Sequence, residues 1–148
     1  MKIEFLILAD SAQVVGGKLF MLGGAWNLHR SGNYPSQFQF SIALSIMVPW
    51  DEAGVRHPFT LTIADDAGVP VIPQIQGQFE VGKSDQILND DTTQRALVSV
   101  NITMAVPHPG RYIVSATAGP SKVATTFDAI FIGQKVELTP DPTAEKGN

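Results

Sequence analysis

The stretch Gln37–Val48, QFQFSIALSIMV, decides the fold. Every second position carries a large apolar side chain, and these side chains are Phe38, Phe40, Ile42, Leu44, Ile46 and Val48. The positions between them carry glutamine, serine and alanine almost throughout. A helical period of 3.6 residues would scatter the six apolar side chains around the helix axis. The pattern therefore predicts a half-buried β-strand, with one face in a core and the other in water.

Alternating or short apolar runs recur along the chain and bring the number of predicted strands to about eight. The other runs lie near residues 3–8, 19–22, 59–63, 75–81, 98–104, 112–118 and 123–132. Turn-forming stretches such as Asp65–Gly68 and Ala118–Ser121 separate them. This spacing predicts an all-β protein, a single antiparallel β-sandwich that is jelly-roll-like or immunoglobulin-like.

The glycine-rich stretch Val14–Gly24, VVGGKLFMLGG, could be a phosphate-binding loop or a hairpin. A phosphate loop has the pattern G-x-x-x-x-G-K-[ST], but here Ala12 stands at the first glycine and Leu19 at the hydroxyl position. Adjacent glycines also break the dinucleotide pattern G-x-G-x-x-G. Gly16–Gly17 instead suits the two central positions of a tight hairpin turn. Gly23–Gly24 then indicates a bulge or a close approach of two backbones.

Length and composition bound the class of protein. A chain of 148 residues is long enough for one domain that buries roughly 70% of its unfolded surface. It contains no cysteine, which excludes disulfides, thiolate metal sites and cysteine nucleophiles. Its net charge is -4, and no two lysine or arginine residues lie within three positions of each other. Nucleic-acid binding requires clustered positive charge, so no nucleic-acid partner is predicted.

The two ends of the chain bear on location and domain limits. The N-terminal apolar run Phe5–Ala9 is too short for a signal-peptide core, and no run approaches the ~18 residues of a membrane span. We therefore expect a cytoplasmic protein with no membrane contact. The sandwich domain is predicted over residues 1–133. Residues 134–148, QKVELTPDPTAEKGN, are expected to form a flexible C-terminal tail that only a partner would order.

Candidate chemical groups are few. None of His29, His57 and His108 has ligand spacing with another histidine or a carboxylate. The pairs Asp65–Asp66 and Asp90–Asp91 lie in predicted loops, and we interpret them as solvated turn residues. No G-x-S-x-G nucleophile motif occurs. We therefore predict no catalytic residue, no metal ligand, no cofactor and no enzymatic activity. An enzyme would need one of these histidines beside a carboxylate or serine in a cleft.

Three aromatic residues, Trp26, Tyr34 and Trp50, flank predicted turns rather than strand centres. Rings at loop ends can line a carbohydrate groove or anchor an interface. They can equally pack over the end of the core, which is the interpretation that we favour for Trp50. These three are the candidate ligand or interface residues.

Five motifs carry a resemblance: LADSAQ (Leu8–Gln13), GGKLFMLGGAWN (Gly16–Asn27), MVPWDEAG (Met47–Gly54), GQFEVG (Gly77–Gly82) and PHPGRYIVSA (Pro107–Ala116). Together they resemble a family of small bacterial proteins known as a domain of unknown function. The resemblance spans Met1 to about Ile132 and implies a short cytoplasmic β-sandwich. It brings no activity, cofactor or catalytic residue with it.

Two functions remain open from the sequence. The first is a non-enzymatic structural or protein-interaction module, self-associating as a homo-oligomer through strand edges, the tail and uncharged polar strand faces such as Gln74–Gln78 and Ser99–Thr103. The alternative is a module that binds a small molecule or carbohydrate in a pocket at one end of the sandwich. That pocket would be lined by at least two of Trp26, Tyr34 and Trp50.

Overall fold

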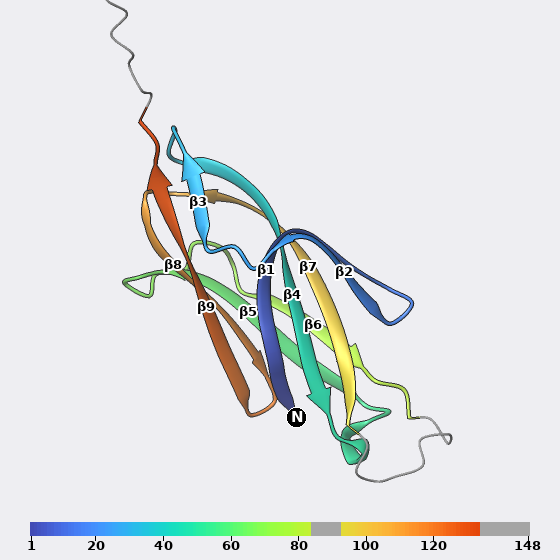
Figure 1. The fold of residues 1–148 in the computed structure, drawn as a ribbon. Helices are drawn as coiled ribbons and strands as arrows, with labels where there is room; N and C mark the ends of the chain where they lie inside the picture. The colour runs from blue at the N-terminus through green and yellow to red at the C-terminus, as the bar shows by residue number, and fades with distance from the viewer. Residues whose placement is uncertain (84–92, 134–148) are drawn as a thin grey trace, which may run out of the picture.

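The computed structural model describes residues 1–83 and 93–133, which form strands joined by short turns (Figure 1). The elements are β1 (Lys2–Val15), β2 (Lys18–Gly24), β3 (Leu28–Ser31), β4 (Ser36–Val48), the 3-10 turn η1 (Trp50–Glu52), β5 (Arg56–Asp65), β6 (Ile75–Glu80), β7 (Gln94–Val106), β8 (Gly110–Ala118) and β9 (Ser121–Phe131). The all-β class is confirmed. In this part of the chain, no helix is long and apolar enough to cross a membrane.

The strands form two sheets. Sheet A has the order β2-β1-β4-β7, and sheet B has the order β3-β9-β8-β5-β6. Sheet B is curled like half a barrel. Neighbouring strands are antiparallel except for β3, which pairs in parallel with Asp128–Phe131 of β9. The sequence did not predict this strand, because its four residues LHRS carry no alternating run, and the expectation of about eight purely antiparallel strands is wrong on that point.

The core lies between the sheets and follows the alternation of Gln37–Val48. Five of the six apolar residues on that face of β4, from Phe40 to Val48, are at most 2% exposed. Sheet B contributes Leu61, Ile63, Tyr112, Val114 and Phe127 to the same cluster. Each such side chain contributes about 1.5–3 kcal/mol when it leaves water, so this shared cluster is the main source of stability.

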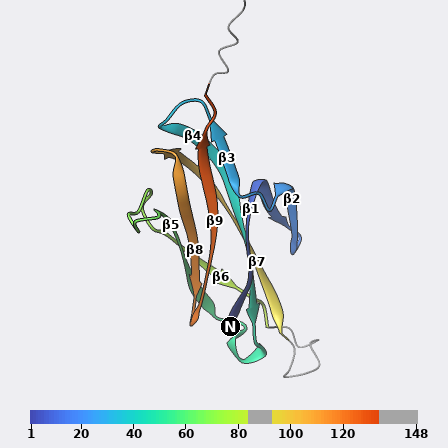
Figure 2. The same ribbon diagram turned by 60° about the vertical axis from the view of Figure 1, so that its left-hand side comes forward.

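The other face of β4 is not solvated, contrary to the prediction. Ser41, Ala43 and Ser45 are only 3%, 0% and 0% exposed. They are covered because the β1–β2 hairpin folds across the outside of sheet A, where β1 contacts β7 although the two strands are not neighbours in the sheet. Figure 2 shows the hairpin on the side of sheet A that faces away from sheet B.

The turn into β8 is closed by a tyrosine. The Tyr112 hydroxyl donates a hydrogen bond of 2.6 Å to the carbonyl of His108, four residues upstream. The ring is fully buried and stacks on Phe127, with 5.3 Å between ring centroids. The motif PHPGRY therefore joins β7 to β8 with a side-chain lock rather than with backbone bonds alone.

Two predictions fall on residues that the structure does not describe. The C-terminal tail, residues 134–148, lies outside the described residues, as does the pair Asp90–Asp91. Of the pair Asp65–Asp66, Asp65 is the last residue of β5 and Asp66 begins the turn that follows. There the Asp65 carboxylate accepts hydrogen bonds from the backbone N–H groups of Ala67 and Val69.

Candidate functional site

The candidate site is the β1–β2 hairpin, residues 10–24, and its construction begins at the turn. Gly16 and Gly17 have φ angles of 58° and 71°, so both central positions are left-handed, as a type I′ turn requires. Val15 and Lys18 pair across the turn and fix the register. The hairpin interpretation of VVGGKLFMLGG is confirmed.

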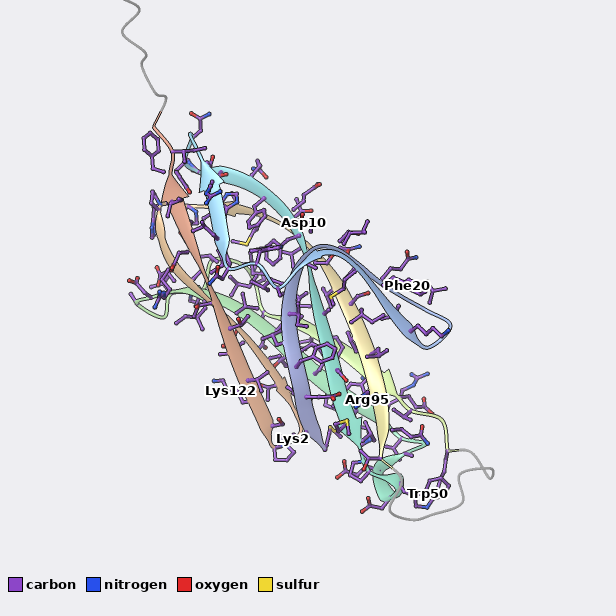
Figure 3. All side chains as sticks on the ribbon, in the orientation of Figure 1. Lys2, Asp10, Phe20, Trp50, Arg95 and Lys122 are labelled. Atoms are coloured by element: carbon purple, nitrogen blue, oxygen red, sulfur yellow. The ribbon has the colours of Figure 1, made fainter. Side chains whose placement is uncertain are left out.

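The first strand of the hairpin, β1, pairs with two different strands along its length. From Lys2 to Ala9, β1 pairs with β4; beyond Ala9, its partner among the described strands is β2 alone. The bend is tight, since a Cβ atom at Gly23 would overlap the carboxylate of Asp10, the residue that Figure 3 labels near this bend. The neighbour of Gly23 is thus the Asp10 side chain, and not a second backbone as predicted. The hairpin is therefore free to leave β4 and cross the sheet.

The hairpin has an inner face and an outer face. Ala12 and Leu19 lie on the inner face and form a small apolar cluster with Ile7, Ala9 and Ala43. Ala12 and Ala43 are 6% and 0% exposed, and their short side chains allow the hairpin to lie close to β4.

The outer face is open to solvent. On it, Phe20 lies opposite Gln13, Leu22 opposite Ser11, and Val15 opposite Lys18. Phe20, Leu22 and Val15 are 57%, 74% and 52% exposed, and Figure 3 shows Phe20 on this hairpin. A contiguous exposed apolar stripe of this kind is typical of an interaction surface.

The predicted ring residues do not form one site. Trp26 packs against Phe38, Phe40 and Phe127 at centroid distances of 5.2, 5.5 and 6.0 Å. The Tyr34 hydroxyl donates a hydrogen bond of 2.6 Å to the carbonyl of Ile130, and burial raises the pKa of Tyr34.

Trp50 lies apart from these two rings, in η1 at the opposite end of the molecule from β3 (Figures 1 and 3). The Lys83 ammonium group lies over its ring, 4.8 Å from the ring centre. Five hollows on the described surface are lined by other residues, and none of Trp26, Tyr34 and Trp50 lines any of them. Trp26 is therefore a packing residue of the main core cluster, whereas Trp50 lies outside that cluster.

The histidines are held by local hydrogen bonds. His29 Nε2 lies 3.0 Å from the Ser36 hydroxyl, its ring stacks on Phe38, and burial lowers its pKa. Ser36 is only 7% exposed, and His29 is half-buried.

The other two histidines bond to backbone carbonyls. His57 Nε2 donates a hydrogen bond to the carbonyl of Glu52 at 2.6 Å, and His108 Nδ1 donates one to the carbonyl of Pro109 at 2.9 Å. Within residues 1–83 and 93–133, no three histidine or acidic side chains gather as a metal site would require.

A cluster of charged and polar side chains connects strands of sheet A beside the hairpin. Arg95 of β7 donates two hydrogen bonds, of 2.7 and 3.0 Å, to the carboxylate of Glu4 on β1. The Ser45 hydroxyl of β4 donates a third, of 2.8 Å. These bonds, the Arg95 ones first, lower the pKa of Glu4 to about 2. Three strands of sheet A are thus joined on the face that the hairpin covers.

A polar hollow of about 350 Å³ lies where β1 leaves β4. Its polar side chains are those of Asp10, Ser11, Gln39, Ser41, Asn101 and Thr103. The Ser41 hydroxyl donates a hydrogen bond of 2.8 Å to the amide oxygen of Asn101. The sequence did not predict this site, because its residues come from three strands and the bend of β1 adds Asp10 and Ser11 to the β4–β7 pairs.

The chain matches a protein family over most of its length. The model of a family described as "Family of unknown function (DUF6941)" matches residues 4–126, which covers the described strands up to the middle of β9. No curated protein matches the chain. The resemblance found in the five sequence motifs, to an uncharacterised domain family, is confirmed.

Proposed function

We propose that this chain, which belongs to the family of unknown function DUF6941, is a non-enzymatic structural or protein-interaction module that self-associates. On this proposal its partner is a protein, and it binds neither nucleic acid nor a membrane. It uses no cofactor, and it is located in the bacterial cytoplasm. The observation that carries the proposal is the apolar outer face of the hairpin.

We infer that the scaffold is an immunoglobulin-like β-sandwich. With the hairpin strand left out, sheet A reads β1-β4-β7, and without β3, sheet B reads β9-β8-β5-β6. Immunoglobulin sandwiches have the corresponding orders A-B-E and G-F-C-C′. The hydrogen bond from Tyr112 to His108 supports the same inference, since a tyrosine at the start of strand F closes the corner in that fold. On this scheme β2 and β3 are additions between the first two strands.

The exposed stripe supports a binding role because the fold does not use it. Phe20 and Leu22 lie on the face of the hairpin away from the Ala12–Ala43 contact, so their side chains contribute little to the core. Polar residues at these positions would leave the packing beneath unchanged. Large apolar side chains gathered on a rigid hairpin are suited to binding another protein surface.

The test replaces Phe20 and Leu22 together with serine. Native mass spectrometry of protein purified gently from its own cells, with light scattering over a range of concentrations, reports subunit count and retained proteins. We expect association in the wild type and its loss in the double variant. Val69→Ser is the matched control, because Val69 is 56% exposed but lies in the turn after β5. A wild-type chain that is a bare monomer at every concentration would contradict the proposal.

A second candidate function is the binding of a small molecule or carbohydrate, and the polar hollow at Asp10 favours it. Carboxylate, amide and hydroxyl groups are the partners that sugar hydroxyls take in proteins. The hollow lacks the three rings that the sequence suggested, so any binding there depends on hydrogen bonds. Glucose, galactose and N-acetylglucosamine can be titrated while amide chemical shifts are followed by NMR. Shifts confined to Gln39, Asn101 and Thr103, and lost in Asn101→Ala, would establish this function.

A further inference from the structure

We propose that two copies of this chain pair antiparallel through their β2 strands, about a two-fold axis at Met21, so that the two A sheets become one continuous sheet. This inference rests on the proposed function and names the partner as a second copy of the same chain. It also fixes the register of the contact, which makes it separately testable.

The first step is the hydrogen-bonding capacity of the edge. β2 is the terminal strand of sheet A, and β1 is its one neighbour among the described strands. In a hairpin with a two-residue turn, the closing pair, here Val15 and Lys18, is a hydrogen-bonded pair. Alternate residues then turn their backbone groups away from β1, and in β2 these are Leu19, Met21 and Gly23. Their N–H and C=O groups are available to another strand.

The second step is the match between side chains. In an antiparallel pair centred on Met21, Leu19 of each copy lies opposite Gly23 of the other, and Phe20 lies opposite Leu22. Phe20 and Leu22 both lie on the outer face of the hairpin, so the four side chains form one apolar patch across the axis. Pairs of large apolar side chains directly across strands stabilise a sheet.

Charge favours the antiparallel arrangement of two like copies. Lys18 is the one charged residue of β2, and in this register it lies opposite Gly24 rather than opposite its own copy. Asp10 lies at the glycine end of the hairpin, beside Gly23. Antiparallel pairing therefore brings the basic end of one hairpin toward the acidic end of the other, whereas parallel pairing would bring the two lysines together.

The other terminal strands of the two sheets are less suited to pairing. β6 presents the exposed polar side chains Gln76, Gln78 and Glu80, and β3 has only four residues. At the far edge of sheet A, β7 carries the Arg95–Glu4 ion pair. Charged side chains and short length are the devices by which proteins block edge pairing. In β2 the charge is confined to the first residue, and the strand has no proline.

The backbone test compares Met21→Pro with Met21→Ala. Proline removes the N–H group at position 21, which faces the open edge, and so leaves the β1–β2 hydrogen bonds in place. We expect the alanine variant to remain dimeric by light scattering and the proline variant to be monomeric with an unchanged β-sheet circular dichroism spectrum. A proline variant that is as dimeric as the alanine variant would overturn the proposal.

The register test does not depend on how well proline is tolerated. The chain has no cysteine, so single Cys variants at positions 19, 20, 21 and 22 report disulfide formation without background. At a two-fold axis through a hydrogen-bonded pair, the two Cα atoms of residue 21 are about 5.5 Å apart, within the range of a disulfide. We expect Met21→Cys to form covalent dimers under mild oxidation and Leu19→Cys to remain monomeric on reducing-agent-free gels.

The outcomes separate this inference from the proposed function. If association is lost in the Phe20→Ser, Leu22→Ser variant but Met21→Cys does not cross-link, the hairpin binds protein in another way and the β2–β2 pairing is wrong. If cross-linking occurs at Leu19→Cys instead, the pairing is again wrong. If the wild type is a bare monomer, both proposals fail together.

Discussion

The Phe59 ring lies directly over Gly77, its partner in the β5–β6 ladder. A Cβ atom at position 77 would overlap the ring, so the glycine makes room for a side chain that is only 6% exposed. Glycine weakens a strand by its conformational freedom, but here that cost is offset by the burial of an aromatic ring against the backbone.

Gly77→Ala should therefore destabilise the protein by about 1–3 kcal/mol, because the ring must leave its position. Urea unfolding followed by circular dichroism measures the change. Gly82→Ala is the matched control, since no atom lies within 4 Å of a Cβ there and no left-handed φ angle is required. Equal midpoints for the two variants would show that the Phe59 contact does not constrain position 77.

Tyr112→Phe should lower the free energy of unfolding by about 0.5–1.5 kcal/mol, because it removes the hydrogen bond to the His108 carbonyl and keeps the buried ring. Tyr112→Ala should cost more, about 3–5 kcal/mol, because the ring itself is lost from the core. Denaturant unfolding of the three proteins gives both values. A phenylalanine variant as stable as the wild type would mean that the hydroxyl does not hold the corner.

Stability should depend on pH through Glu4. Because its pKa is about 2 in the folded protein and 4.5 ordinarily, its ionised form contributes stability that is fully present above pH 4.5 and is lost as the pH falls toward 2. The difference in unfolding free energy between wild type and Glu4→Gln should be constant near neutral pH and should shrink over that window. Arg95→Met should reduce the same pH-dependent difference, because only the Ser45 hydrogen bond to Glu4 then remains. A difference that persists unchanged at pH 2 would contradict the ion-pair origin.

Ala43→Leu should weaken the packing of the hairpin without unfolding the two sheets. The Ala43 side chain has no exposed surface and projects from β4 toward the inner face of the hairpin. A larger side chain there pushes the hairpin outward. Hydrogen–deuterium exchange should become faster in residues 10–24 and stay unchanged in β8 and β9. Ala105→Leu, at an exposed position of β7, should change neither region. Unchanged exchange in the hairpin of Ala43→Leu would show that it does not rest on β4.

The sequence predicted the strands and the core face well, because both depend on a local period of two residues. The pattern in Gln37–Val48 marks the buried face of β4 residue by residue. It failed on the outer face, since the burial of Ser41, Ala43 and Ser45 depends on a separate hairpin, residues 10–24, earlier in the chain.

The candidate site was only partly predictable. The two-residue turn could be read from Gly16–Gly17, because its geometry requires left-handed residues. The exposure of Phe20 and Leu22 could not, because a run of apolar residues after a turn has the same pattern whether it is buried or open. The polar hollow at Asp10 arises from the bend of β1, which no local pattern encodes.

Because of the order of elements along the chain, the β1–β2 hairpin can form before the rest of sheet A during synthesis. The backbone pairs between its two strands are complete once Gly24 has left the ribosome, whereas sheet A cannot close until Val106, the last residue of its outermost strand, has followed. At ordinary elongation rates, roughly 80 residues take on the order of 4–16 s. Through that interval, a nascent chain presents Phe20 and Leu22 to neighbouring nascent chains on the same messenger RNA. Assembly of two copies could therefore begin on the polysome, before either sandwich exists.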